Sequence, residues 1–197
     1  MPTLFILGGV NGAGKSTLAQ AMLRSPVLKS VAFLNADVNA AQLRAGRPEL
    51  TVEAANFLGL RMVARATERL LNERQSFMTE TVLASVAHRT LALRAQQAGY
   101  KVRLVYVAVA SVEDSIARVA RRVAKGGHDV PEKDLRRRWE RSHDALTWFA
   151  GHADEVRVFD NAVYGRRPVL VARAVSGRLD FCRANNLPSV MRALAAI

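Results

Sequence analysis

The stretch Gly9-Val10-Asn11-Gly12-Ala13-Gly14-Lys15-Ser16 decides how the rest of the chain is interpreted. It fits the pattern G-x-x-x-x-G-K-[ST], in which glycines let the backbone curl so that successive N–H groups point at phosphate oxygens. An apolar run at residues 4–7 precedes it, and a helix-forming segment follows it from Lys15. Because this strand–loop–helix context is the one the pattern requires, a chance glycine-rich turn is the weaker interpretation.

We expect this loop to bind ATP and Mg²⁺. Lys15 would reach the β- and γ-phosphates, and the Ser16 hydroxyl would be a ligand of Mg²⁺. The start of the following helix adds partial positive charge. The N-K-x-D pattern that reads guanine is absent from the sequence, which favours ATP over GTP. The residues expected to contact the nucleotide are Gly9, Asn11, Gly12, Ala13, Gly14, Lys15, Ser16 and Thr17.

Apolar runs of strand length alternate with segments of helical period along most of the chain. Four further runs predict strands at residues 31–34, 76–79, 101–110 and 155–159, and the segments between them predict helices. This alternation is typical of a parallel sheet with helices on both faces. We therefore predict an α/β fold, a P-loop NTPase three-layer sandwich with a mostly parallel five-stranded sheet.

The tail is predicted to differ from the rest. Residues 169–175 and 178–182 flank Ser176-Gly177 and predict a β-hairpin, with a short helix from about Ser189. The hairpin could extend the sheet or form an interface. Without an internal repeat or linker, we expect one domain over residues 1–197, with a helical lid at about 112–150 and the hairpin and helix at about 166–197.

Two carboxylates follow predicted strands. Asp37 comes after the second strand and Glu80 ends the third, so both would lie with the phosphate loop at the carboxyl ends of the strands. Transfer of a phosphoryl group to a hydroxyl needs a carboxylate that orients the acceptor and takes its proton, and Asp37 is our candidate base. The alternative, of equal weight, is that Asp37 only caps the following helix. Glu80 could bind the acceptor or hold Mg²⁺ through water.

The charge of the chain is unusual. Its 197 residues include 29 Lys and Arg against 17 Asp and Glu, a formal net charge of +12, and only five of the basic residues are Lys. This excess suggests a polyanionic partner, such as a nucleotide or nucleic acid. Residues 118–141 form a basic pair of helices around Gly126-Gly127-His128, which could close over the nucleotide. We expect Arg122 and Arg138 to contact phosphate and the others to form a solvated face.

Several classes of protein are disfavoured by composition. A single cysteine, Cys182, excludes an internal disulfide framework and a cysteine-rich zinc site. Apolar runs stay shorter than the roughly 18 residues of a membrane span, and the N-terminus lacks the pattern of a secretory signal. We therefore expect a cytoplasmic protein with no membrane partner, and interpret His128 as a turn residue.

Several segments together resemble the zeta toxin family of P-loop kinases. The resemblance extends over about residues 3–165, and its most specific part is the Gly-Gly-His elbow with flanking arginines. The segments that carry it are GGVNGAGKST at residues 8–17, Asn35-Ala36-Asp37, Glu80-Thr81-Val82-Leu83, RVAKGGHDVP at 122–131, Arg136-Arg137-Arg138, Arg141-Ser142 and Asp160-Asn161.

This resemblance implies ATP-dependent phosphorylation of a small acceptor, which for characterised zeta toxins is the sugar of UDP-N-acetylglucosamine. It implies that Asp37 is the base and that Glu80 and Thr81 line the acceptor pocket. It also implies that Arg122 and Arg138 are lid arginines. Asn161, at the end of the last parallel strand, could touch the adenine or turn the chain. An antitoxin partner is a further implication of the resemblance.

Two positions depart from the family pattern. Val82 and Ala84 stand where the toxins have Thr and Arg, side chains that hold the diphosphate of the acceptor. Their loss removes charge-assisted hydrogen bonds of about 1.5–3 kcal/mol each. We therefore expect this chain to share the reaction of the zeta toxins more closely than their substrate. The rival functions are a polynucleotide end kinase, an ATP-dependent binding or switch protein without an acceptor, and a plain nucleic-acid-binding domain, which the intact phosphate loop disfavours.

Overall fold

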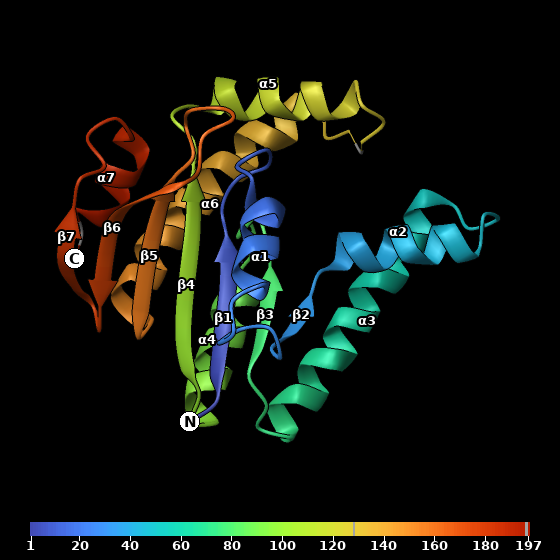
Figure 1. The fold of residues 1–197 in the computed structure, drawn as a ribbon, viewed down its shortest axis with the longest axis horizontal. Helices are drawn as coiled ribbons and strands as arrows, with labels where there is room; N and C mark the ends of the chain where they lie inside the picture. The colour runs from blue at the N-terminus through green and yellow to red at the C-terminus, as the bar shows by residue number, and fades with distance from the viewer. Residues whose placement is uncertain (128, 196) are drawn as a thin grey trace.

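The computed structural model describes residues 1–127, 129–195 and 197 (Figure 1). Helices and strands alternate until the last third of the chain. The strands are β1 (Thr3–Gly8), β2 (Ala32–Leu34), β3 (Phe77–Glu80), β4 (Lys101–Ala108), β5 (Glu155–Asp160), β6 (Val169–Val175) and β7 (Arg178–Cys182). The helices are α1 (Lys15–Leu23), α2 (Ala36–Gly46), α3 (Val52–Asn72), α4 (Ala87–Gln97), α5 (Val112–Val123), α6 (Glu132–His152) and α7 (Pro188–Leu194).

All the strands join one sheet in the order β2-β3-β1-β4-β5-β6-β7. The first five pair in parallel, and β6 and β7 add to β5 as an antiparallel hairpin. The predicted α/β fold with a parallel sheet and a C-terminal hairpin is confirmed. Of the two alternatives left open for the hairpin, the structure has the one in which it extends the sheet.

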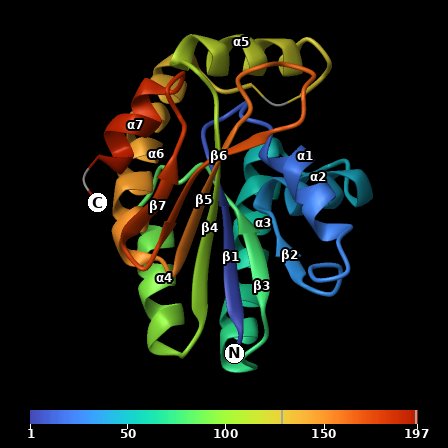
Figure 2. The same ribbon diagram turned by 60° about the vertical axis from the view of Figure 1, so that its left-hand side comes forward.

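Helices cover both faces of the sheet, as the apolar runs predict. Leu104 and Tyr106 of β4 pack on one face with α3, α4, α6 and α7, and Val105 and Val107 pack on the other with α1. Because β4 is buried on both faces, its sequence is almost continuously apolar rather than alternating. Figure 2 shows α1 on one side of the sheet, and α4 and α6 on the other.

The predicted lid contains two parts with different packing. α5 and the start of α6 share a small cluster of their own, formed by Val119, Val130 and Leu135. The second half of α6 instead packs in the main core through Leu146 and Phe149. His128, interpreted above as a turn residue, lies outside the described residues. None of the helices described is long and apolar enough to cross a membrane.

The carboxyl ends of β1, β3 and β4 meet below α5, beside the helical pair α2–α3 (Figure 1). In a parallel sheet, ligands bind outside these carboxyl ends. The topology therefore places the phosphate loop, the end of β3 and the start of α2 around one space.

Candidate active site

The phosphate loop depends on glycine at positions where no side chain would fit. Gly9 has φ +139°, and a Cβ added there would overlap the backbone oxygen of Val107. Gly14 has φ +93° and lies against the side-chain amide of Asn161. Both φ values fall in a region that L-residues rarely adopt. The loop can therefore approach β4 and the end of β5 closely only with this sequence.

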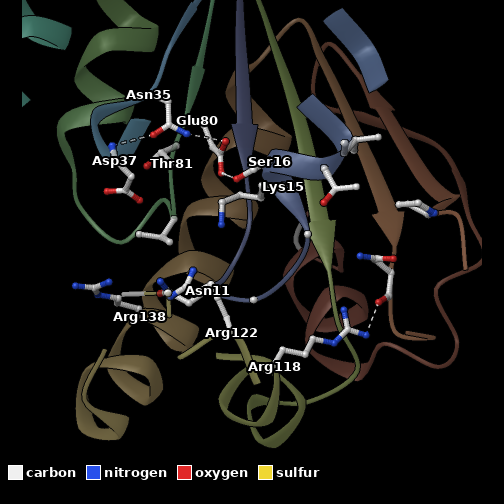
Figure 3. Close-up of a pocket in the computed structure, with 18 of the residues that line it drawn as sticks. Asn11, Lys15, Ser16, Asn35, Asp37, Glu80, Thr81, Arg118, Arg122 and Arg138 are labelled. Carbon is white, nitrogen blue, oxygen red and sulfur yellow. Dashed lines mark hydrogen bonds between the residues drawn. The ribbon is translucent and has the colours of Figure 1, made fainter. Parts of the chain in front are cut away.

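Side chains from distant segments hold the loop by its carbonyl groups. Ser115 Oγ of α5 donates to the Asn11 oxygen at 2.7 Å, and Asn161 Nδ2 donates to the Ala13 oxygen at 2.8 Å. Arg118 in turn donates to the backbone oxygens of Asn161 and Ala162, at 2.8 and 2.7 Å (Figure 3). These bonds occupy carbonyl groups of the loop, and within the loop the N–H of Ala13 donates to the Val10 oxygen at 3.3 Å.

Lys15 lies at the centre of the site and is only 8% exposed. Its ammonium donates to the Val10 oxygen at 3.0 Å. Burial lowers the pKa of Lys15 to about 8, against the opposing influence of Glu80 and Asp37, and with a further lowering by Arg122 and Arg138. The structure therefore gathers, around one lysine, the two carboxylates and the two lid arginines that the sequence selected.

Glu80 joins the phosphate loop to the start of α2. Ser16 Oγ donates to Glu80 Oε1 and Asn35 Nδ2 donates to Glu80 Oε2, both at 2.8 Å (Figure 3). Hydroxyl and carboxylate oxygens are hard donors of the kind that Mg²⁺ prefers. No cluster of three or more His, Cys, Asp or Glu suited to a metal occurs within the described ranges. The donor set thus fits an ion that is shared with phosphates rather than caged by the protein.

Asp37 is not the cap of α2. Asn35 holds that position, since its Oδ1 accepts from the N–H groups of Asp37 and Val38 at 2.9 and 3.2 Å. The interpretation of Asp37 as only a helix cap is therefore wrong. Its carboxylate lies in the first turn, where the helix dipole favours negative charge, and lines the cleft.

These elements surround an open cleft of about 1670 Å³. Among the described residues, eleven Lys and Arg side chains line it, against the two carboxylates of Asp37 and Glu80. The predicted site residues that line it are Asn11, Gly12, Gly14, Lys15, Ser16, Thr17, Asp37, Glu80, Thr81, Arg122, Arg138 and Asn161. Gly9 and Ala13 are buried and shape the loop instead.

Three features of the cleft were not predicted from the sequence. Asn35 bridges Glu80 to α2, and Arg118 holds the chain after β5. Arg166 and Arg167, at the start of the region predicted to hold the tail hairpin, line the same cleft as the lid arginines. An Asn directly before a helix is a recognisable cap signal, so Asn35 could have been found. The other two depend on which segments the fold brings together.

Comparison with known proteins gives matches to one family model and to solved structures. A family model described as "Zeta toxin" matches residues 1–167. No curated protein sequence matches the chain.

Solved structures resemble the chain at low sequence identity. The AvrRxo1-ORF1:AvrRxo1-ORF2 complex matches with a TM-score of 0.72 and 18% identity, over 98% of this chain and 64% of that one. One such structure contains ATP. The PezAT toxin–antitoxin system of Streptococcus pneumoniae matches with a TM-score of 0.68 and 16% identity, over 96% of this chain and 77% of that one. A putative kinase from Chloroflexus aurantiacus matches with a TM-score of 0.54 and 20% identity, over 72% of this chain and 76% of that one. This chain therefore spans less than two thirds of the AvrRxo1 chain.

Proposed function

The chain belongs to the zeta toxin family, and from that premise we propose that it is a kinase that transfers the γ-phosphoryl group of ATP to a hydroxyl of a small molecule. The observation that carries the proposal is the contact of Ser16 with Glu80, beside Lys15 and with Asp37 on the same cleft. A phosphate loop supplies nucleotide binding in many proteins. A carboxylate on the acceptor side is the additional element that phosphoryl transfer needs.

In this proposal the phosphate loop and Lys15 bind the β- and γ-phosphates of ATP, with Thr17 and Asn161 at the edge of the nucleotide site. Mg²⁺, bound through Ser16 and with Glu80 close by, would offset the charge of the phosphates. Arg122 and Arg138 extend from the two lid helices toward the same phosphates. Their fixed positive charge would stabilise the negative charge that develops on the transferred group.

Asp37 acts as the base. As the acceptor oxygen forms a bond to the γ-phosphorus, the bond from that phosphorus to the β-γ bridging oxygen breaks and ADP leaves. The proton of the acceptor hydroxyl passes to the carboxylate of Asp37. The exposed position of this carboxylate in the cleft, free of any cap bond, supports the assignment.

The proposed acceptor is a small hydroxyl compound, and a nucleotide sugar such as UDP-N-acetylglucosamine is the first candidate. Val82 and Ala84 lie on the cleft and carry no charge, so any acceptor diphosphate would need other partners. We further propose a single domain that acts in the cytoplasm, and an antitoxin as a protein partner.

The test is incubation of the protein with ATP, Mg²⁺ and a metabolite extract, followed by mass spectrometry for compounds that gain one phosphoryl group. New products with the wild type and none with Lys15→Ala would support the proposal. ATP binding without any product would favour the switch protein instead. Selective phosphorylation of oligonucleotide ends would support the polynucleotide kinase.

A further inference from the structure

The side of the cleft that follows β3 differs in chemistry from the rest. We call Thr81, Val82, Ala84, Ser85 and His88 the acceptor wall, since they line the cleft directly after Glu80. None of the five carries a fixed charge, whereas the loop, the lid and the segment after β5 supply the cations. An acceptor on this wall therefore meets hydroxyl, apolar and imidazole groups.

Two hydrogen bonds of the Thr81 hydroxyl join His88 to the backbone of Leu83. The Thr81 hydroxyl oxygen accepts from the N–H of Leu83 at 3.0 Å and lies 3.3 Å from His88 Nδ1. The hydroxyl has one proton and two lone pairs, so it can donate the proton to Nδ1 while one lone pair accepts from Leu83. In this arrangement His88 carries its own proton on Nε2.

Nε2 is the part of His88 left for a ligand. No described residue forms a hydrogen bond with it. It is also not one of the fully buried polar atoms without a partner, so it is not enclosed by protein. His88 also lines the cleft. Burial lowers the pKa of His88 to about 4, so the ring is neutral at physiological pH and offers a single N–H donor.

The segment that presents this donor is firmly anchored. The N–H of Thr81 donates to the Leu7 oxygen of β1 at 3.0 Å. Leu83, fully buried against Gly8, has φ +57°, a left-handed conformation that is costly for a leucine. Strained residues of this kind persist where the surrounding structure holds them and are common at binding sites.

We infer that His88 is a specificity-determining residue whose Nε2–H donates to an uncharged oxygen of the acceptor, a hydroxyl or carbonyl such as a sugar or nucleoside presents. The inference rests on the proposed function and deepens it. A phosphate would be matched by a cation at this point, and the acceptor wall offers none. Any phosphate on the acceptor would therefore lie toward the arginines, with its uncharged part against His88.

The hydrogen-bond chain can be tested without knowledge of the acceptor. NMR of the protein labelled with ¹⁵N-histidine should show His88 protonated on Nε2 and neutral at mildly acidic pH. Thr81→Ser should keep this tautomer, and Thr81→Val should weaken it. Protonation on Nδ1, or a charged ring at mildly acidic pH, would overturn the inference.

The role in recognition is tested with the metabolite extract as probe. With dilute extract, His88→Ala should lower product formation about five- to tenfold, the worth of one hydrogen bond, and concentrated extract should restore it. His88→Gln, which keeps an N–H donor, should recover most of the loss. Equal product from His88→Ala and wild type in dilute extract would overturn the inference.

The two proposals fail in different ways. If the wild type forms no phosphorylated product, the kinase proposal fails, and with it the assigned role of His88. If the wild type forms product and His88→Ala forms the same amount, the kinase proposal stands and the inference about His88 fails. ATP affinity of each variant serves as the check that it is folded.

Discussion

The phosphate loop and the lid face each other across one cleft but are held in different ways. The loop is fixed by glycine conformations and by bonds from Ser115 and Asn161 to its carbonyls. The lid presents arginines from α5 and α6. These two helices pack on each other through the small cluster of Val119, Val130 and Leu135. The glycines and these bonds preorganise the nucleotide half of the cleft, whereas the lid is attached through the end of α6 in the main core and through Ser115 and Arg118 of α5.

The two halves of the cleft control different parts of the chemistry. A loop backbone held in this way serves ATP whatever the acceptor is. Arg122 is exposed on α5 and Arg138 is half-buried on α6, and both line the lid side of the cleft. Substitutions in the loop should therefore abolish activity, and those in the lid should reduce it by degrees.

The largest effect is expected in the loop. Lys15→Ala removes the buried cation at the centre of the site and should lower kcat/KM for ATP by about a thousandfold or more. Lys29→Ala, on an exposed residue away from the cleft, is the matched control. Steady-state measurement of ADP release is the readout. A Lys15→Ala enzyme that keeps a tenth of the wild-type activity would contradict the central role assigned to the loop.

The lid arginines should give an intermediate effect. Arg122→Ala and Arg138→Ala should each lower kcat by about a hundredfold, because each removes one charge from the transferred group. Arg136→Ala is the control on the same helix, since Arg136 pairs with Glu132 and Glu113 at the surface. If all three variants lose activity equally, the effect belongs to lid folding and not to phosphate contact.

The protonation of Lys15 predicts a pH dependence of ATP binding. The ammonium is charged below its pKa of about 8 and neutral above it. Affinity for ATP should therefore fall as the pH rises through about 8, by up to tenfold per pH unit. Lys15→Arg keeps its charge and should bind ATP without this dependence. Parallel titrations of both proteins by calorimetry would check it, and identical profiles would refute the assignment.

The sequence predicted the loop half better than the rest of the site. The phosphate loop is a local structure, because its glycines, Lys15 and Ser16 are adjacent in the chain. The strands and helices could be predicted for the same reason. The bridge from Asn35 to Glu80 and the bond from Asn161 to Ala13 join residues that are distant in sequence. These follow from the strand order and helix placement, which no local pattern specifies.

The smallest effect is expected at the start of α2. Asn35→Ala removes a helix cap and should lower the free energy of unfolding by about 1 kcal/mol. Thr51→Ala removes the cap of α3 and should cost a similar amount. Because only Asn35 also holds Glu80, only Asn35→Ala should raise the Mg²⁺ concentration needed for activity. Urea unfolding and Mg²⁺ titration of both variants would separate the two roles, and equal Mg²⁺ requirements would contradict the bridge.

The role of Asp37 as the base in phosphoryl transfer is the central proposal. Single-turnover transfer from ATP to the acceptor found in the extract, compared between wild type and Asp37→Asn, measures this step directly. In Asp37→Asn, ATP affinity should stay within about threefold of the wild type while the rate constant of transfer falls by about 10²–10⁴. A transfer rate equal to that of the wild type would contradict it.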